Sequence, residues 1–529
     1  MDITSLTAPA VNATTANWTQ TGMVDRFWRG DPSVWSDDPD TPELGNRLGW
    51  LDLHDTMRPE LADIERVAGE VAARSDHVVL CGMGGSSLAP DVFSAVFGRS
   101  EGFPELIVLD STHPGAVLAV ESRIDPARTT FVISSKSGTT LETLSFFRYF
   151  WAATGGDGER FIAVTDPGSR LSALGRDRGF HAVFEANPDV GGRFSALTHF
   201  GLVPAALMGV DVAALLDAAA RLAAQADSNA NHDPVAGIGI ALAEAARVGR
   251  DKLTILTSPS LSSLPAWMEQ LIAESLGKDG TGIVPVADEP IGDPSVYGPD
   301  RVFLSYQLQG EHAPDLERLS KAGFPVIGFE LPTESSLGYE MLRAEGFTAV
   351  AGAVLGVHPF NQPNVEAAKD FARRAMSGDL DLGSVETLTG SEAAAALVLM
   401  VDGLGPGGYF GVHAYLPPGD GLWSAITDLR TAVRAKTGVA TTAGWGPRFL
   451  HSTGQLHKGG PAGGAFVQLV DDPGTGLAVP ETENTFDEII GAQSAGDRAA
   501  LIEAGRDVIR IDVGSDAAGM VRSLIGALA

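Results

Sequence analysis

The stretch His77-Val-Val-Leu-Cys-Gly-Met-Gly-Gly-Ser-Ser87 joins a short hydrophobic run to a glycine-rich turn, and a helical pattern follows it. This order is typical of a parallel α/β sheet, in which buried strands alternate with helices and the turns after the strands approach a ligand. Further hydrophobic runs, separated by helical stretches, predict strands at 105–110, 129–134, 161–165 and 181–184. We therefore expect a ligand at the carboxyl ends of these strands.

The same alternation continues along the chain. Helical stretches are predicted at 193–208, 210–226 and 234–247, and strands at 253–257, 301–305, 325–329, 409–416, 465–470 and 508–513. The acidic segment 471–485 is the best loop candidate late in the chain. We predict an α/β protein with an irregular N-terminal arm (1–60), a first domain (61–230), a second domain (231–389) and a C-terminal α/β region (390–529).

Composition limits the classes of partner. The 529 residues carry 67 acidic and 37 basic side chains, a formal net charge of −30 at pH 7, so a nucleic-acid partner is not expected. Met1 to Gln20 lacks a secretory signal, and no hydrophobic run approaches the ~18 residues of a membrane span. Cys81 is the one cysteine, and the eleven histidines show no metal-binding spacing. We expect a cytoplasmic protein without a metal or a membrane partner.

Two loops point to an anionic ligand. Ser134-Ser-Lys-Ser-Gly-Thr-Thr140 offers five hydroxyls and one ammonium before a predicted helix, which favours a phosphate over a simple capping turn. The loop Gly82–Ser87 alone leaves three interpretations open: a phosphosugar site, a dinucleotide site with Asp110 on the ribose, or a structural turn.

With three later motifs, these loops resemble the sugar-isomerase (SIS) domains of the phosphoglucose isomerase family. The later motifs are Val190-Gly-Gly-Arg-Phe-Ser195, Gln270-Leu-Ile-Ala-Glu-Ser-Leu-Gly-Lys278 and His358-Pro-Phe-Asn-Gln-Pro-Asn-Val-Glu-Ala-Ala-Lys369. The five motifs occur in order over roughly residues 75–370. The resemblance implies two SIS-type, Rossmann-like subdomains with parallel sheets. It also implies a cofactor-free homodimer that interconverts an aldose 6-phosphate and its 2-ketose.

The resemblance also assigns roles to individual residues. It implies that the phosphate is bound by Ser135, Lys136, Ser137 and Thr140. It also implies that Gly85 and Ser86 contact the sugar chain and that Glu142 is a supporting carboxylate. It further implies that Glu274 is the base that transfers the proton and that Arg193 stabilises the enediolate. By the same resemblance, Gln362 orients the hydroxyls, and His451 and Lys369 open the ring.

Spacing supports some of these roles independently. Glu274 shares a helical face with Trp267 and Leu271, and a carboxylate on a hydrophobic face suits proton transfer. An ordinary ion pair with Lys278, four residues on, is the alternative. Gln362 and Lys369 are seven residues apart, which places both on one helix face.

The histidine departs from the family pattern. The family's motif usually follows the Glu-Ser-x-Gly-Lys segment within a few tens of residues, but that interval holds only His312, in different surroundings. Leu450-His-Ser-Thr-Gly-Gln-Leu-His-Lys458 carries a similar motif far downstream, so His451 is the candidate and His457 its rival. This order resembles the isomerase portion of fused transaldolase–phosphoglucose isomerases, although we find no transaldolase half. The family often takes this histidine from the neighbouring subunit.

Two other functions stay open from sequence: an NAD(P)-dependent oxidoreductase and a non-catalytic phosphosugar sensor. A sensor would normally carry a basic helix-turn-helix, which is absent from the acidic N-terminal segment. Activity on mannose 6-phosphate is also left open.

Overall fold

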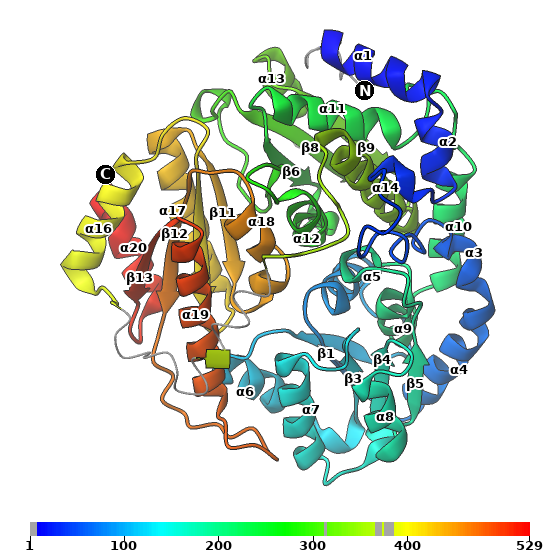
Figure 1. Cartoon of the computed structure of the whole chain (residues 1–529). Coiled ribbons are helices and arrows are strands. Elements are labelled where there is room, and N and C mark those ends of the chain that lie inside the picture. The colour runs from blue at the N-terminus through cyan, green and yellow to red at the C-terminus, as the bar shows by residue number, and fades with distance from the viewer. Residues whose placement is uncertain (1–7, 312–314, 365–372, 375–385, 529) are drawn as a thin grey trace.

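The computed structural model describes residues 8–311, 315–364, 373–374 and 386–528, in which the chain forms three parallel sheets flanked by helices (Figure 1). The first sheet has the order β2-β1-β3-β4-β5. Its strands are β1 (His77–Cys81), β2 (Glu105–Leu109), β3 (Thr129–Ser134), β4 (Phe161–Thr165) and β5 (Ala182–Glu185). Its helices are α4 (Leu61–Ala72), α5 (Leu88–Phe97), α6 (Pro114–Arg123), α7 (Leu141–Ala153), α8 (Arg170–Asp177) and α9 (His199–Leu207). All five predicted strands are confirmed.

Burial explains why these strands could be predicted. Every residue of β3 and β4 is buried, because helices cover both faces of the sheet. Their sequences are accordingly runs of β-branched and aromatic residues rather than alternating patterns. Helix α9 begins later than predicted, at His199, because Thr198 caps it and residues 192–194 form a separate 3₁₀ turn.

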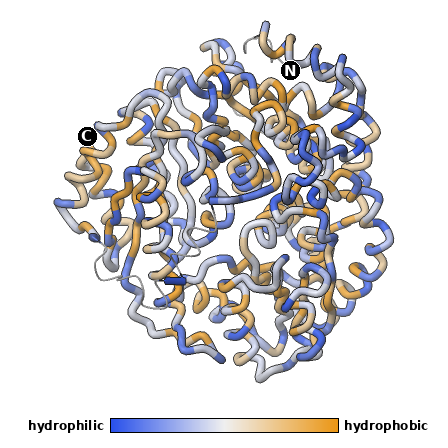
Figure 2. The backbone as a smooth tube through the Cα atoms, viewed as in Figure 1, coloured by the Kyte–Doolittle hydropathy of each residue, from blue (hydrophilic) through white to orange (hydrophobic). Residues whose placement is uncertain are grey.

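The second sheet has the order β7-β6-β8-β9. Its strands are β6 (Lys252–Thr257), β7 (Val284–Val286), β8 (Arg301–Leu308) and β9 (Val326–Leu331). Its helices are α10 (Val212–Ala223), α11 (Ala236–Arg247), α12 (Leu264–Leu276), α13 (Leu316–Lys321) and α14 (Leu337–Leu355). Helix α12 is central and largely hydrophobic in Figure 2, and most of its side chains are buried. The sequence missed β7, which has only three residues.

The third sheet has the order β11-β10-β12-β13. Its strands are β10 (Tyr409–Tyr415), β11 (Ala440–Trp445), β12 (Gly464–Val470) and β13 (Asp507–Asp512). Its helices are α16 (Gly390–Asp402), α17 (Asp420–Thr437), α18 (Gly454–Gly459), α19 (Phe486–Glu503) and α20 (Ala517–Leu528). The sequence missed β11, whose two threonines and glycine do not form a hydrophobic run.

The strand order determines where a ligand can bind. The first strand of each sheet lies between the second and the third, so the chain reverses direction across the sheet at that point. A crevice opens at the carboxyl ends of the two strands that flank such a reversal. In the first sheet these strands are β1 and β3, and the loops that follow them are 82–87 and 135–140.

The N-terminal segment is more regular than predicted. It contains helices α1 (Ala8–Gln20), α2 (Met23–Trp28) and the short α3 (Leu53–Thr56). Thr14 of α1 donates a 2.7 Å hydrogen bond to Glu244 of α11, and Trp28 Nε1 donates one of 2.7 Å to Asp233. The prediction of an irregular arm was wrong for α1, because packing against α11 stabilises a segment whose composition alone is polar.

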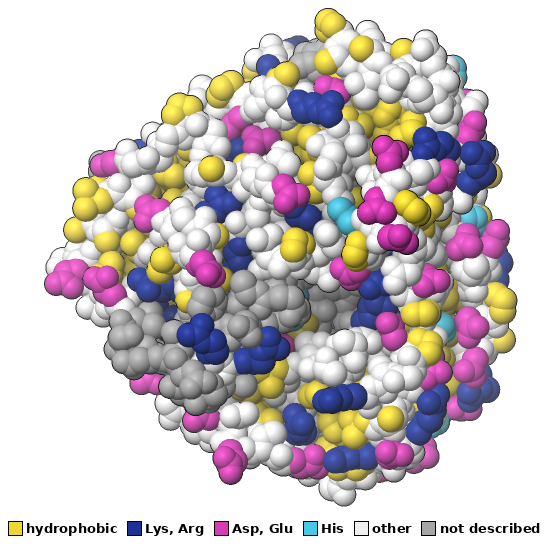
Figure 3. Space-filling view, viewed as in Figure 1, with side chains coloured by type: hydrophobic (Ala, Val, Ile, Leu, Met, Phe, Trp, Pro, Cys, Tyr) yellow, Lys and Arg dark blue, Asp and Glu magenta, His cyan; other side chains and the backbone are white. Residues whose placement is uncertain are grey.

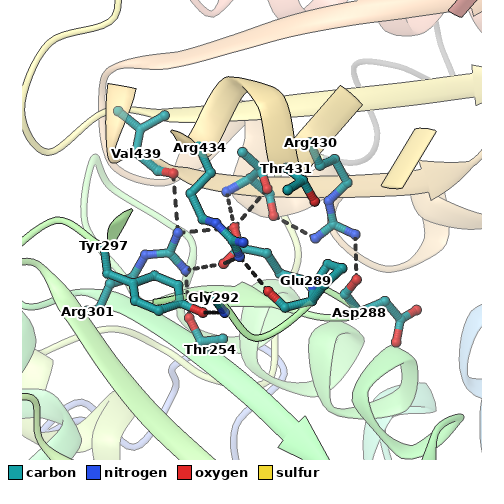
Figure 4. Close-up of polar contacts among 12 residues, drawn as sticks. Thr254, Asp288, Glu289, Gly292, Tyr297, Arg301, Arg430, Thr431, Arg434 and Val439 are labelled. Atoms are coloured by element: carbon teal, nitrogen blue, oxygen red, sulfur yellow. Dashed lines mark hydrogen bonds and ion pairs between the residues drawn. The ribbon is translucent and has the colours of Figure 1, made fainter. Parts of the chain in front are cut away.

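A buried ionic cluster joins the second and third sheets (Figure 4). Glu289 receives two hydrogen bonds from Arg301, at 3.0 and 3.1 Å, and lies 3.1 Å from Arg434 of α17. Burial opposes ionisation, but Arg301 and Arg434 outweigh it and lower the pKa of Glu289 to about 2.

Helix α19 links the third sheet to the first. It begins with Phe486, whose ring stacks on Phe146 of α7 at 6.2 Å between centroids. In Figure 1 it runs alongside the third sheet, and its lower end lies near α6 of the first sheet region. The third sheet is therefore held against both of the others. Among the described residues, none of the helices combines the length and the hydrophobicity that a bilayer crossing requires.

Candidate active site

Three chain segments meet at the glycine-rich loop 82–87. Gly84 has a φ of +55°, and a Cβ placed on it would lie 2.5 Å from the carbonyl oxygen of His451. A Cβ on Gly85 would lie 2.1 Å from the carbonyl oxygen of Gly192. The glycines therefore let the first sheet approach the Gly191–Arg193 turn and the histidine segment at van der Waals distance.

The hydroxyl-rich loop lies between β3 and α7. Ser135 and Thr140 share a hydrogen bond of 2.9 Å between their hydroxyls, and the N–H of Gly138 donates to Ser135 Oγ at 3.2 Å. Ser137 is exposed, whereas Ser135 is buried. The hydroxyls of Ser135 and Thr140 thus lie together at the N-terminal end of α7, an arrangement suited to an anion.

Lys136 has a carboxylate partner. Its Nζ donates to Asp166 Oδ2 at 2.6 Å and to the carbonyl of Pro188 at 3.2 Å. Burial raises the pKa of Asp166, and Lys136 counteracts this. The ammonium of Lys136 is therefore held by Asp166 and the Pro188 carbonyl, and part of its charge is balanced.

His451 reaches the first turn of α7. Its Nε2 lies 2.9 Å from Oε1 of Glu142, which also accepts a 2.7 Å hydrogen bond from Gln493 Nε2. Gln493 is itself fixed by Thr112, whose hydroxyl donates to Gln493 Oε1 at 2.6 Å. Glu142 is buried and directly follows the hydroxyl loop, so His451 is anchored next to that loop.

One amide connects the histidine segment to Glu274. Gln270 Nε2 donates to the carbonyl of His451 at 2.7 Å and to Glu274 Oε2 at 3.2 Å. The other carboxylate oxygen, Glu274 Oε1, lies 3.1 Å from Arg193 Nη1. An unbroken set of contacts therefore runs from Glu142 through His451 and Gln270 to Glu274 and Arg193.

Arg193 is buried and fully engaged. Its Nε donates to Ser275 at 2.8 Å and its Nη1 to Gln362 Oε1 at 3.1 Å. Its Nη2 donates to the carbonyls of Pro359 and Asn361 at 2.6 and 3.0 Å. Burial lowers the pKa of Arg193, and the adjacent Glu274 opposes that shift. The guanidinium is thus held rigidly between Glu274 and Gln362.

The alternative ion pair between Glu274 and Lys278 does not form. Among the described residues, the ion-pair partner of Glu274 is Arg193, while Lys278 Nζ donates to the carbonyl of His358. Burial, together with the nearby Arg193, lowers the pKa of Lys278 to about 6. Glu274 therefore lies in a polar setting at the end of the hydrophobic stripe formed by Trp267 and Leu271.

These contacts gather around the centre of the molecule. Figure 3 shows a hollow near the middle of the view, in the region between α12 and β1 of Figure 1, with Lys and Arg side chains along one side. Lys369 and His312 lie outside the described residues.

Known proteins resemble this chain over the region that carries Arg193 and Glu274. A family model described as phosphoglucose isomerase matches residues 52–292. A glucose-6-phosphate isomerase of Rubrobacter xylanophilus is 32% identical over an alignment of 381 positions that covers 61% of this chain and 87% of that relative. The chain belongs to the phosphoglucose isomerase family. A glucose-6-phosphate isomerase of Thermus thermophilus, 31% identical, aligns over 64% of this chain and 92% of its own length.

Solved structures agree on the fold of this family member. A hypothetical protein from Thermus thermophilus has a TM-score of 0.59 and 25% identity and covers 70% of this chain and 98% of its own. A glucose-6-phosphate isomerase from Chlamydia trachomatis has a TM-score of 0.53 and 19% identity, with coverage of 68% and 78%.

The rival histidine of this family member lies elsewhere. His457 is buried and stacks on His413 at 4.7 Å between ring centroids. Burial lowers the pKa of His457 well below its usual value, and neither ring nitrogen has a hydrogen-bond partner among the described residues. His451, in contrast, lies at the meeting point of the family's motifs.

The dinucleotide interpretation fits poorly. Asp110, its ribose candidate, accepts a 3.2 Å hydrogen bond from Ser87 and lies 3.3 Å from Arg448 Nε. Burial raises the pKa of Asp110, and Arg448 opposes the shift. Asp110 is therefore engaged in tying the glycine loop to the histidine segment.

The residues to which the sequence assigns a role do not include Gln270, Ser275 or Gln493. Gln270 lies four residues before Glu274 on one helix, so helical spacing could have found it. Ser275 belongs to the Glu-Ser-x-Gly-Lys segment, so that motif could have indicated it. Gln493 stands in no pattern that indicates a site, since only the folded chain brings it to Glu142.

Proposed function

We propose that this phosphoglucose isomerase family member interconverts glucose 6-phosphate and fructose 6-phosphate through a cis-enediolate. The observation that carries this proposal is the shared amide of Gln270, which donates to both Glu274 and the backbone of His451. It holds the proposed proton-transfer carboxylate beside the backbone of the residue that carries the imidazole, so that both groups can serve a reaction that opens a ring and then moves a proton.

The substrate phosphate would bind at the hydroxyl loop. Ser135, Ser137 and Thr140 supply hydroxyls, and Lys136 supplies charge beside them. At a net charge of −30, the distant field does not attract a dianion, and salt screens it within about 8–10 Å. Local donors must therefore hold the phosphate.

The sugar chain would extend from the phosphate toward α12. Gly85 and Ser86 contact it, and His451 with Lys369 moves the ring-oxygen proton to open the ring. Glu142 holds His451 in place at 2.9 Å. Glu274 then carries hydrogen between C2 and C1 of the open chain.

Negative charge develops on the substrate oxygens during this transfer. The guanidinium of Arg193, fixed by Ser275 and by backbone carbonyls, is preorganised to stabilise it. Gln362, which accepts from Arg193, orients the hydroxyls. The substrate's own carbonyl acidifies the carbon, so the proposed reaction needs no cofactor.

An assay coupled to glucose-6-phosphate dehydrogenase tests this proposal. With fructose 6-phosphate as the substrate, NADPH should form only when the coupling enzyme is present. The same assay should then be run with mannose 6-phosphate. Reduction of NAD(P) without the coupling enzyme would favour the oxidoreductase. Saturable substrate binding without turnover would favour a phosphosugar sensor.

The homodimer and the cytoplasmic location remain predictions. The structure offers one argument about the dimer: His451 reaches Glu142 within a single chain. We propose that a dimer, where it forms, does not exchange this histidine between subunits.

A further inference from the structure

A second pocket lies behind the histidine segment. It has a volume of about 300 Å³, and all three sheet regions contribute to it through α5, α12, the residues after β7, the start of α17 and the end of β11. Arg448, Phe449 and Ser452 form one wall. His451 lies between these residues in sequence and reaches Glu142 instead, so the pocket is separate from the candidate active site.

Acidic side chains predominate among the charged groups that line the pocket. Arg448 is paired at 2.7 Å with Asp91 and at 3.3 Å with Asp110, so its charge is already balanced. Three further carboxylates line the pocket without such a partner in the described chain: Glu269, Asp288 and Asp420. Figure 4 shows the Asp288 side chain turned away from the arginine cluster, to which only its backbone carbonyl is joined.

Glu269 gives the second indication of a ligand. It is 8% exposed, and its Oε1 has no hydrogen-bond partner in the part of the chain that the structure describes. A buried carboxylate oxygen without a donor is costly, and a bound donor would relieve that cost. Burial, together with the charge of Asp288, raises the pKa of Glu269 to about 8, against the opposing charge of Arg430.

Two tryptophans supply an apolar wall. Trp423 and Trp445 both line the pocket and are half-buried, with ring centroids 5.2 Å apart. Indole faces attract organic cations as well as hydrocarbon chains. A neutral sugar would leave the carboxylates uncompensated. The described residues also contain no group of three or more His, Cys, Asp or Glu side chains arranged for a metal ion.

We propose that this pocket binds a small organic cation, with an ammonium or guanidinium group at Glu269 and Asp288 and its carbon chain against Trp423 and Trp445. Because the occupant contacts Phe449 and Ser452, it also biases the position of His451. This second part rests on the proposed isomerase function, whereas binding itself does not.

Titration calorimetry with agmatine tests binding directly, at about 150 mM salt to screen the general acidity of the protein. We expect saturable binding that weakens at least tenfold in Glu269→Gln and in Asp288→Asn. Glu101→Gln, which removes a carboxylate from a different surface hollow, is the matched control and should bind like the wild type. Equal affinity in all variants, or equal heat with 1,4-butanediol, would overturn the site.

A second readout needs no variant. A cation beside Glu269 favours its ionised form, so binding at pH 7 should release a proton because the pKa lies near 8 beforehand. The binding heat should then change with the ionisation enthalpy of the buffer, and heat independent of the buffer contradicts the proposed contact.

Agmatine should also change kcat for fructose 6-phosphate in the wild type but not in Glu269→Gln. An unchanged kcat at saturating agmatine rejects the link to His451.

Discussion

His451 and Glu142 are 309 residues apart in the sequence, yet His451 Nε2 lies 2.9 Å from Glu142 Oε1. One belongs to the third sheet region and the other to the first turn of α7. The C-terminal region therefore completes a site whose remaining described parts lie on the first two sheets. This relationship explains how a histidine motif far downstream in the chain can still lie among the family's other motifs.

The role of His451 can be separated from that of His457. Replacing His451 with Ala should lower kcat on fructose 6-phosphate by about 10²–10⁴-fold, since an acid–base group is lost. The loss should be much smaller on erythrose 4-phosphate, which has no ring to open. His457→Ala should lower the melting temperature with little preference between the two substrates, because His457 packs against His413 in the core. Similar losses on both substrates for His451→Ala would contradict a ring-opening role.

Glu274→Gln keeps the shape of the side chain but removes its basicity. We expect kcat on fructose 6-phosphate to fall by about 10²–10⁴-fold or more, while KM changes little because the hydroxyl loop is untouched. Glu244→Gln is the matched control: Glu244 is also a helical glutamate paired with an arginine, Arg247, at 2.8 Å. If Glu274→Gln retains more than about a tenth of the wild-type kcat, the base must be another group.

Most of the strands and the motifs could be predicted from the sequence for one physical reason. Buried parallel strands such as β3 and β4 need uninterrupted hydrophobic runs, and the loops that follow them need residues of restricted type. Short or polar strands do not form such runs, and the sequence therefore did not predict β7 and β11. Helix α1 was not predicted because its stability comes from packing on α11, which the local sequence pattern does not show.

The site was readable only in part. The resemblance to the family's motifs indicated Glu274, Arg193 and Gln362, and the contacts among them are close. Spacing could not tell that Arg193 rather than Lys278 would pair with Glu274, because Arg193 is remote in sequence. The same holds for Gln493, which depends on α19 crossing to the first sheet.

Gln493 should act as a positioning residue for His451. Its amide donates to the same carboxylate oxygen that His451 contacts, so Gln493→Ala should lower kcat on fructose 6-phosphate about tenfold. The double variant His451→Ala/Gln493→Ala should lose little beyond His451→Ala alone. Additive losses would mean that Gln493 acts independently of the histidine.

Glu289 should make stability depend on pH. Its pKa is lowered from 4.5 to about 2 in the folded chain, so its contribution is fully present above pH 4.5 and is lost as pH falls toward 2. Glu289→Gln should destabilise the protein by about 3 kcal/mol at pH 7, because Arg301 and Arg434 lose their buried partner. The gap in melting temperature between wild type and variant should be constant from pH 7 to 5 and narrower at pH 3.5. A gap that widens at low pH would contradict the ionised, stabilising carboxylate.

Mixing two inactive variants tests whether the site is built within one chain. Where subunits exchange the histidine, mixed dimers of His451→Ala and Glu274→Gln would contain one intact site, and activity would return toward a quarter of the wild type. Here His451 contacts Glu142 of its own chain, and Gln270 joins its backbone to Glu274 of that chain. Each chain in the mixture therefore still lacks one group, and refolding the two variants together should restore no activity. A matching mixture of wild type and Glu274→Gln should show half the wild-type activity per chain. Recovery in the first mixture would establish that the histidine comes from the partner.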